Sequence, residues 1–322
     1  MLFRSIRLKI AKALMRIKEI HPKFHPKGRM AMTEVFNHEH FLNADSITQN
    51  EIMNNISLFR YKDEMKYPLD NYFDTDLSKL LRGNSALDLG CFTGGRSVAW
   101  FERYNLDKIH GIDVRDVFIQ AAKQFADSKS VNAEYKVSKG ENLPYEDSKF
   151  DAILSFDVFE HLVSVKKTLS ECHRVLKKGG KLVLVFPSYY HPFEHHLGLV
   201  TRTPCIHWFL SGRLLTKAYY EIINSRGKND QWYNRKTPYL EEWERSNILN
   251  GVTYRKFKSL LDPGDWRVIS EAHKPVGAIG RNVEGKKGLQ LISKLFVPLT
   301  YIPYLQEFTL HRVSYILEKR RE

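Results

Sequence analysis

Short apolar runs and amphipathic stretches alternate through the middle of the chain. Five apolar runs predict buried strands, at residues 85–90, 108–113, 133–138, 150–157 and 181–186. Three stretches with apolar positions at helical spacing predict helices between them, at residues 96–103, 116–128 and 166–176. Strands that alternate with helices in this way are typical of parallel βαβ units. The pattern therefore predicts an α/β fold built on a doubly wound sheet.

The alternation stops over residues 188–250 and then resumes. The interrupting segment is rich in His, Tyr and Trp, which indicates an insertion after the fifth strand. Beyond it the pattern predicts a helix at 254–261, a strand at 266–272, a proline-broken apolar stretch at 287–304 and a strand at 308–318. Two further strands bring the predicted sheet to seven. We expect the apolar stretches at 197–223 and 289–305 to pack as buried lid helices.

The N-terminal part predicts a different kind of element. Within residues 2–20 apolar side chains recur at steps of three and four between Arg and Lys, as in an amphipathic helix. The stripe consists of Phe3, Ile6, Ile10, Leu14, Ile17 and Ile20. We expect four regions along the chain: a basic helix with a helical cap at 1–80, a core at 81–190, a lid at 191–250 and the completion of the sheet at 251–322.

Positive charge is concentrated at the start of the chain. The 322 residues carry a net charge of +13, and residues 1–30, with nine Lys and Arg against the single acid Glu19, carry +8 of it. Such an excess favours a polyanionic partner, a membrane surface or an acidic substrate. Because most of it belongs to one amphipathic helix, it favours an anionic membrane over a nucleic acid.

Cysteine usage and hydropathy suggest a compartment. Cys91, Cys172 and Cys205 are too few and too irregularly spaced for a disulfide framework, which favours a reducing environment. No apolar run reaches the roughly 18 residues of a spanning helix, and the charged N-terminus is unlike a secretory signal. We expect a cytoplasmic protein, held peripherally at the inner membrane face through its basic helix.

The turn after the first predicted strand and the acid that ends the second predict a cofactor site. Ligands of doubly wound sheets lie beyond the carboxyl ends of the strands. There Gly90 and Gly94 let a ligand approach the backbone, and the Asp113 carboxylate can accept bonds from both ribose hydroxyls. The glycine spacing does not fit the G-x-G-x-x-G fingerprint of NAD. Asp88 would repel a pyrophosphate but attract a cationic amino-acid tail, so S-adenosylmethionine (SAM) is favoured.

Four segments carry a resemblance that covers about residues 80–190. They are Ala86-Leu-Asp-Leu-Gly-Cys-Phe-Thr-Gly94, His110-Gly-Ile-Asp113, Gly140-Glu-Asn-Leu-Pro-Tyr-Glu-Asp-Ser-Lys-Phe-Asp151 and Leu176-Lys-Lys-Gly-Gly-Lys-Leu-Val-Leu184. In this order they resemble class I SAM-dependent methyltransferases of the small-molecule type, near the ubiquinone and menaquinone biosynthesis group. The resemblance implies SAM as cofactor and a Rossmann-like seven-stranded sheet, mostly parallel with an antiparallel last strand.

The resemblance also implies roles for individual residues. Those expected to bind SAM are Asp88, Gly90, Cys91, Gly94, Asp113, Glu141, Asn142 and Asp157. Glu141 and Asn142 should lie beside the adenine, and the backbone that ends at Asp157 should approach the methionine end. The chain departs from the family at Phe92, where a second glycine is usual, and we expect the Phe92 ring to narrow the cofactor pocket.

Three histidines are candidate bases. Displacement at a sulfonium depends largely on positioning and needs no metal, but a hydroxyl acceptor gains from a base, often a histidine. His161 follows the fourth strand in a Glu-His step that recurs in the resembled group. His195 and His196 lie in the insertion. Because adjacent histidines point to different sides of an element, we expect no metal site there.

The acceptor is narrowed by exclusion. The Asn/Asp-Pro-Pro-Tyr/Phe step of amino-methylating nucleic-acid enzymes is missing after the fourth strand, and Cys205 is better interpreted as an ordinary apolar cysteine than as a nucleophile. We expect a small-molecule, glycan or lipid-linked acceptor, methylated at a hydroxyl. Two alternatives stay open: an RNA methyltransferase with the basic arm on phosphates, and a non-enzymatic binding protein on this fold, for which Phe92 is the support.

Overall fold

The computed structural model describes residues 2–19, 44–192, 195, 197, 200–226, 250–279 and 286–320. Contacts divide the chain into two compact units. Met1–Ile52 and Tyr189–Asn250 form the first, called here the helical unit, and Met53–Ser188 and Gly251–Glu322 form the second, the sheet unit. Residues 20–43 of the predicted N-terminal region at 1–80 and residues 227–249 of the predicted lid at 191–250 lie outside the described residues.

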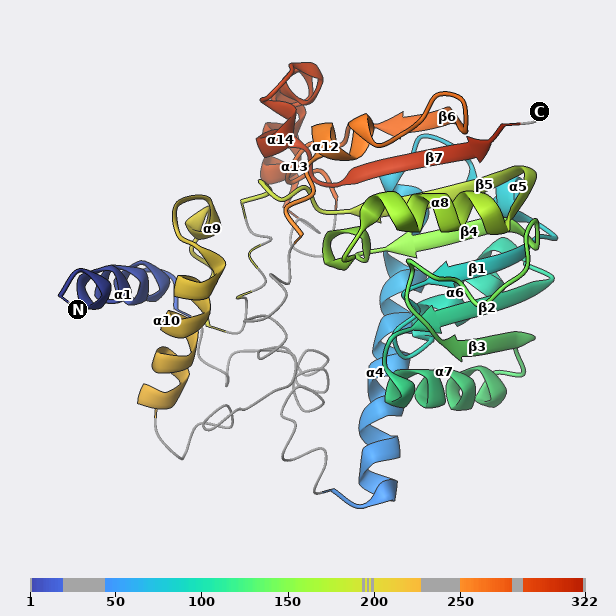
Figure 1. Cartoon of the computed structure of the whole chain (residues 1–322), viewed down its shortest axis with the longest axis horizontal. Helices are drawn as coiled ribbons and strands as arrows, with labels where there is room; N and C mark the ends of the chain where they lie inside the picture. Colours follow the sequence, from blue (N-terminus) through green and yellow to red (C-terminus); the bar gives the residue numbers. More distant parts are fainter. Residues whose placement is uncertain are drawn as a thin grey trace. The chain divides into compact units, whose positions relative to one another are not determined.

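A seven-stranded sheet runs through the sheet unit in the order β3-β2-β1-β4-β5-β7-β6 (Figure 1). Its strands are β1 (Ser85–Leu89), β2 (Lys108–Asp113), β3 (Ala133–Val137), β4 (Phe150–Phe156), β5 (Leu176–Phe186), β6 (Trp266–Ala272) and β7 (Val313–Lys319). β1 pairs in parallel with β2 and β4, whereas β7 pairs antiparallel with β5 and β6. The predicted α/β fold with an antiparallel last strand is therefore confirmed.

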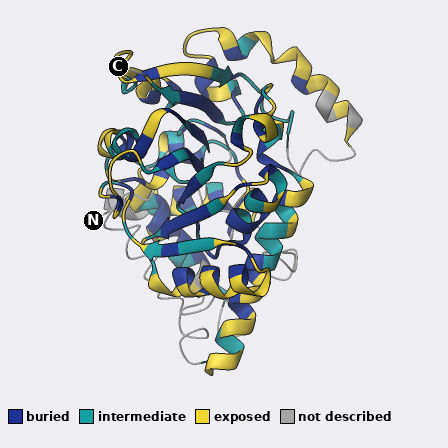
Figure 2. Cartoon of the chain, turned by 90° about the vertical axis from the view of Figure 1, so that its right-hand side faces the viewer, coloured by how far each residue is buried: buried dark blue, intermediate teal, exposed yellow. Residues whose placement is uncertain are grey.

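Helices cover both faces of this sheet. They are α4 (Ser46–Lys66), α5 (Leu77–Leu81), α6 (Gly95–Tyr104), α7 (Asp116–Ser128), α8 (Val165–Val175) and α12 (Tyr254–Ser259), with the 3₁₀ turns η2 (Leu69–Tyr72) and η3 (Phe159–His161). Because side chains alternate along a strand, Leu182 and Leu184 of β5 pack with α8 and α12, and Val183 packs with α5, α6 and α7. Figure 2 shows the buried strands in dark blue and the outer helix faces in yellow.

The boundary between α8 and β5 differs from the prediction. The predicted fifth strand starts at residue 181, after a Lys-Lys-Gly-Gly stop. In the structure β5 begins at Leu176, directly after α8, and includes this segment. Gly179 lies at φ 75°, a left-handed conformation that glycine adopts without steric cost. The glycine thus allows an irregular strand instead of a loop.

The start of the last strand also differs, because β7 begins at Val313 and not at residue 308. The short helix α14 (Gln306–Thr309) precedes β7. The buried Glu307 carboxylate accepts hydrogen bonds from Ser188 Oγ at 2.8 Å and from the amides of Tyr254 and Arg255, both at 2.9 Å. These three donors hold the chain in a turn at Glu307, so the strand can begin only afterwards.

Between β6 and β7 the chain forms α13 (Lys287–Leu295), the 3₁₀ turn η4 (Pro298–Tyr301) and α14. The prediction that this apolar stretch is buried is wrong. Leu291, Leu295 and Tyr304 are all largely exposed.

The helical unit pairs the N-terminal helix with the insertion. Its elements are α1 (Leu2–Arg16), α9 (Ile206–Phe209) and α10 (Gly212–Ser225). Ala11 and Met15 of α1 are fully buried in a cluster with Leu215 and Tyr219 of α10. Lys12 Nζ, also on α1, lies 2.7 Å from a carboxylate oxygen of Glu221 on α10. The predicted helix is thus confirmed as a helix that packs on the insertion.

The buried face of α1 overlaps the predicted stripe only at Leu14, among the stripe residues whose side chains the structure describes. Ile6, Ile10 and Ile17 of that stripe are exposed, whereas Ala11 and Met15 are buried. The helix therefore has two apolar faces, of which α10 covers one. Within the described ranges, each helix is too short or too polar to span a bilayer.

Candidate active site

Three parallel strands bring the predicted cofactor residues to one edge of the sheet. Leu89 of β1 is in register with Ile112 of β2, so Gly90 and Asp113, which follow them, lie side by side. β4 pairs with the other side of β1, and Asp157 follows its last residue. In a doubly wound sheet this carboxyl edge is where ligands bind. The residues predicted to bind the cofactor are far apart in the sequence, but in the sheet unit they lie at neighbouring strand ends.

The turn after β1 depends on a close approach at Gly90. Its φ is 82°, and a Cβ placed there would lie 2.4 Å from Val158 Cγ2. The amides of Gly90 and Cys91 both donate to the carbonyl oxygen of Ile112, at 2.9 and 2.8 Å. Gly94, at φ 74°, precedes α6, and a Cβ there would lie 2.8 Å from Ala122 Cα. The turn is thus a tight backbone cradle that a side chain would fill.

Cys91 contributes to this cradle through its backbone. Its side chain is buried, and burial raises the pKa of the thiol well above its ordinary value. A thiol with a raised pKa holds little of the nucleophilic thiolate at neutral pH. We therefore assign Cys91 no chemical step.

Phe92 adopts the conformation of the glycine that it replaces. Its φ of 49° is left-handed, which costs a residue with a Cβ about 1–2 kcal/mol. The ring packs edge-to-face on Phe118 with centroids 4.3 Å apart, and Arg60 lies 5.8 Å from its centre. These contacts offset the backbone strain. The Phe92 amide also donates to Asp113 Oδ2 at 3.1 Å, so the substitution keeps the turn closed on the acid.

Asp113 is positioned to accept hydrogen bonds from a ribose. Its Oδ2 accepts from Phe92 N and its Oδ1 from Arg115 N, both at 3.1 Å. A carboxylate has about four acceptor positions, so each oxygen retains capacity for one hydroxyl. Burial raises the pKa of Asp113, although the two backbone donors oppose that rise. The geometry fits the predicted role.

Asp88 lies beneath the turn. Only 2% of it is exposed, and its Oδ2 accepts a hydrogen bond from Ser97 Oγ at 2.5 Å. Burial raises its pKa to about 7, while the Ser97 hydroxyl and Arg96 act in the opposite direction. Asp88 therefore joins β1 to α6, and its contact with a cofactor ammonium stays a prediction.

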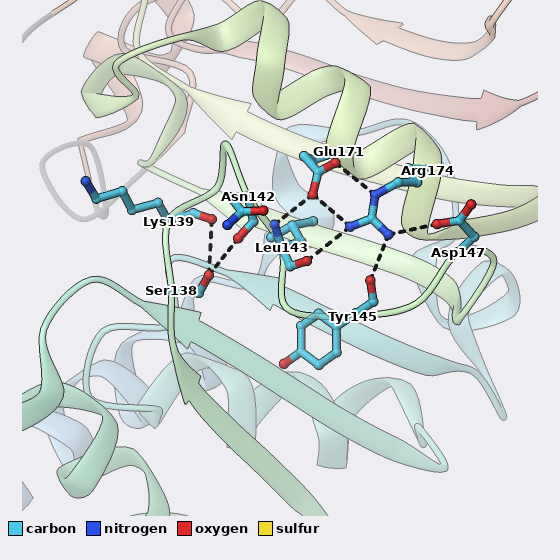
Figure 3. A network of polar contacts seen from close by, with 8 residues as sticks. All are labelled: Ser138, Lys139, Asn142, Leu143, Tyr145, Asp147, Glu171 and Arg174. Atoms are coloured by element: carbon cyan, nitrogen blue, oxygen red, sulfur yellow. Dashed lines mark hydrogen bonds and ion pairs between the residues drawn. The ribbon is translucent and has the colours of Figure 1, made fainter.

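The predicted adenine residues Glu141 and Asn142 lie on the connection between β3 and β4, and Figure 3 shows Asn142 there. Glu141 Oε1 accepts from the Ser164 amide at 3.0 Å, just before α8. The Asn142 side chain is exposed, and the main-chain carbonyl oxygen of Asn142 accepts from Ser138 Oγ at 2.8 Å. Glu141 thus connects this loop to α8, and Asn142 remains accessible to a ligand.

Arg174 of α8 holds the same connection in place. Its guanidinium donates to the carbonyl oxygens of Leu143 and Tyr145, at 3.0 and 2.7 Å, and to Asp147 and Glu171, at 2.8 Å (Figure 3). Glu171 in turn accepts from the Leu143 amide at 2.7 Å, and Arg174 lowers the pKa of Glu171. The planar guanidinium group carries several donors and can therefore hold one loop through several hydrogen bonds at once. No sequence pattern pointed to Arg174.

The structure adds residues beside Asp157. This residue has φ 59°, and its Oδ1 lies 3.6 Å from Arg312 Nη1, just before β7. Tyr72 of η2 packs edge-to-face on Phe156 at 5.2 Å and stacks on His311 at 6.1 Å. Burial raises the pKa of Tyr72. Sequence analysis missed Tyr72 and Arg312, because only long-range pairing brings η2 and β7 to the end of β4.

A second cation lies against the end of β4. Arg96 of α6 lies over the Phe156 ring at 4.1 Å, and its Nε is 3.2 Å from Glu64 Oε2 of α4. The buried Glu64 also accepts from the Leu69 amide at 2.7 Å. α4, α6 and η2 are thereby fixed together behind the strand end.

His161 is placed next to this edge. It ends η3, directly after β4, and its side chain is 34% exposed. Its Nε2 lies 3.7 Å from Oε1 of the buried Glu160. A carboxylate beside the ring can hold its orientation and stabilise the protonated form. His161 therefore combines access with a carboxylate neighbour, as a base requires.

The other candidate bases belong to the helical unit. His195 is buried, and its Nδ1 accepts a hydrogen bond from the Leu197 amide at 3.1 Å. His207 packs near it, with ring centroids 5.9 Å apart, and its Nε2 is 2.7 Å from the Tyr189 carbonyl oxygen. His196 lies outside the described residues. The part of the chain that the structure describes holds no group of three or more metal-ligating side chains.

Comparison with known proteins identifies the sheet unit's middle part. A family profile described as "Methyltransferase domain" matches residues 87–184, from β1 to β5. The norajmaline N-methyltransferase of Rauvolfia serpentina is 27% identical over 219 residues, which cover 62% of this chain and 70% of that protein. The ubiquinone biosynthesis O-methyltransferase of Coxiella burnetii is 29% identical over 102 residues, or 32% of this chain. These matches confirm the family resemblance.

Some relatives are matched over only part of their own length. The match spans only 43% of the Coxiella burnetii protein. Among solved structures, a SAM-dependent methyltransferase of Methanosarcina mazei aligns with 76% of this chain and 97% of its own, at 17% identity and a TM-score of 0.44.

Proposed function

From the premise that residues 87–184 form a class I SAM-dependent methyltransferase domain, we propose that the chain transfers the methyl group of SAM to a hydroxyl of a small-molecule, glycan or lipid-linked acceptor. One observation carries the proposal. The glycine cradle at Gly90, the ribose-type acid Asp113 and the partly exposed His161 all follow strands that end at one edge of the sheet.

The residues of this edge fit SAM. Asp113 would hold the ribose, the backbone of Gly90 and Cys91 would face the cofactor, and Asn142 would lie at the adenine end. A Cβ at Gly90 has no room, which is the property expected of a backbone cradle. SAM supplies an electrophilic methyl group on a sulfonium. Asp113 and Asp157 place carboxylates at the same strand ends, which suits a cationic cofactor.

The chain's own part in the chemistry is to orient the acceptor and take its proton. We assign the base to His161, because it follows β4 and is accessible. Removal of the hydroxyl proton by the ring would leave an imidazolium beside Glu160, whose carboxylate favours that charge. A positioned base of this kind contributes about 10²–10⁴-fold in rate.

The acceptor class rests on the relatives' names and on exposed apolar surface. The sterol 24-C-methyltransferase of Pneumocystis carinii, for example, is 34% identical over 102 residues. Its name indicates a lipid acceptor. In this chain, Ile6 and Ile10 of α1 and Ile17 directly after it are exposed, as are Lys9 and Arg16 of the same helix. A basic helix with an apolar face suits the surface of an anionic membrane.

The decisive assay is transfer of a labelled methyl group from SAM to lipid and glycan extracts, followed by mass spectrometry. We expect a labelled product with the wild type. His161→Gln should lose at least about 100-fold in rate while binding SAM as the wild type does in calorimetry. Asp113→Ala should lose SAM binding itself. A chain that binds no SAM, or binds it equally after Asp113→Ala, would overturn the assignment.

The contribution of α1 is tested separately on vesicles. Ile6→Ser, Ile10→Ser and Ile17→Ser together remove its exposed apolar face and leave Ala11 and Met15 packed against α10. We expect this triple variant to bind anionic vesicles more weakly than the wild type. Equal binding would remove α1 from the proposal.

A further inference from the structure

In the segment 286–308 of the sheet unit the usual distribution of side chains is reversed, with apolar side chains exposed and polar ones buried. Its exposed apolar side chains are Leu291, Ile292, Leu295, Phe296, Val297, Tyr301, Ile302, Tyr304, Leu305 and Phe308. Among the side chains of this segment that the structure describes, the buried ones are polar: Ser293, Thr300, Gln306 and Glu307. Scattered exposed apolar residues are normal, but a contiguous exposed apolar patch marks a contact site.

Two of the buried polar groups, Thr300 and Glu307, anchor the segment to the sheet unit. Thr300 Oγ1 donates to the Val297 carbonyl oxygen at 2.7 Å, and the Thr300 carbonyl oxygen is 2.7 Å from His273 Nδ1 just after β6. The Tyr301 ring stacks on His273 at 4.3 Å. Together with Glu307, which is held by three donors, these contacts tie η4 and α14 to the sheet unit. The outward direction of the apolar side chains is therefore fixed by the fold.

Helix α13 shows the inversion most clearly. Leu291 and Leu295, one turn apart, are 67% and 76% exposed, and Ile292 on the same side is 53% exposed. Ser293, on the opposite side of the helix, is buried. An ordinary surface helix buries its apolar stripe. In α13 the apolar stripe is exposed instead.

Three exposed cations lie within or beside the patch. Lys286 and Lys294 are exposed, and the exposed Arg255 of α12 lies over the Tyr304 ring at 4.1 Å. Among the described residues none of these three cations forms an ion pair. The only acid within 286–308, Glu307, is buried and bonded.

We propose that the segment 286–308 and Arg255 form a surface that docks on an anionic lipid bilayer, with the apolar side chains in the acyl region and the cations at the headgroups. Tyr side chains favour the interface between the two. A protein partner fits less well, because Lys is depleted in protein–protein interfaces. The inference rests on the proposed function in one respect, that the acceptor is membrane-borne.

The test uses the full chain and flotation with vesicles of phosphatidylglycerol and phosphatidylcholine, or of phosphatidylcholine alone. We expect the wild type to bind the anionic vesicles, Leu291→Ser/Leu295→Ser to bind them at least tenfold less, and Lys294→Glu to lose part of the preference for anionic lipid. Ile47→Ser is the matched control, since Ile47 is 78% exposed but lies on α4. It should bind like the wild type.

Two results would overturn the proposal. One is vesicle binding that is absent in the wild type or unchanged in the double variant. The other is a wild-type dimer in sedimentation velocity that the double variant dissociates, which would assign the patch to a second copy. SAM binding, measured by calorimetry on the same preparations, reports independently on the proposed function, so either idea can fail alone.

Discussion

The close approach at Gly90 allows a quantitative test of the cradle. Gly90→Ala adds a methyl group at φ 82°, 2.4 Å from Val158 Cγ2. The left-handed conformation costs about 1–2 kcal/mol, and overpacking costs about 1–3 kcal/mol. The free energy of unfolding should therefore fall by about 2–5 kcal/mol. Since relief of the clash moves the backbone at the cofactor edge, the affinity for SAM should fall as well.

Gly83 is the matched control. It has nearly the same φ, 72°, but a Cβ there meets nothing within 4 Å. Gly83→Ala should cost only the conformational part, about 1–2 kcal/mol, and should leave SAM affinity unchanged. The difference between the two alanine variants then measures the steric part.

A double-mutant cycle identifies the partner. Val158→Ala removes both Cγ atoms that a Gly90 Cβ would meet at 2.4 and 3.1 Å. In urea denaturation the pair Gly90→Ala/Val158→Ala should be more stable than the sum of the single losses, by about 1–2 kcal/mol. Equal losses for Gly83→Ala and Gly90→Ala, or strict additivity of the pair, would refute the reasoning.

Three further predictions concern stability. Burial raises the pKa of Asp88 to about 7, so the folded state keeps the proton of this carboxyl over a pH range in which the unfolded chain has lost it. The free energy of unfolding should therefore fall between about pH 4 and pH 7. Asp88→Asn should flatten this slope in urea titrations, and an unchanged slope would contradict the prediction. Arg174→Ala should lower the free energy of unfolding by about 1–3 kcal/mol, because it leaves the carbonyl oxygens of Leu143 and Tyr145 unpaired. Lys177→Ala, which removes an exposed ion pair with Asp151, should lower it by under about 1 kcal/mol. Equal losses would argue against a structural role for the Arg174 hydrogen bonds. Phe92→Ala loses the ring but keeps the strain, so thermal melts should place it below Phe92→Gly, which relieves about 1–2 kcal/mol of strain.

The sequence predicted most of the sheet because its signals are local. The runs that form β1, β2 and β4 are bounded within one residue of their predicted ends. Asp113 and Gly90 could be paired in advance, since parallel strands end at one edge. The spacing of apolar residues depends on a few neighbouring positions, so it can be recognised without knowledge of the tertiary structure.

The parts that could not be predicted depend on distant partners. Tyr72 meets Phe156, and Arg312 lies near Asp157, only because η2 and β7 fold to the end of β4. In α1 and α13 an apolar stripe revealed a helix but not which face the fold would cover. The buried face of α1 turned out to contain Ala11 and Met15. For the same reason the apolar stretch at 289–305, which is largely exposed, was expected to be buried.

The pairing of α1 with α10 has a consequence for biosynthesis. Lys12 and its partner Glu221 are 209 residues apart. At roughly 10 residues per second, α1 leaves the ribosome about 20 s before α10 exists. During that interval both apolar faces of α1 are uncovered and available to chaperones or to a nearby lipid surface. The helical unit can therefore close only after the strands β1 to β5 have been made, so the order of synthesis separates the maturation of the two units.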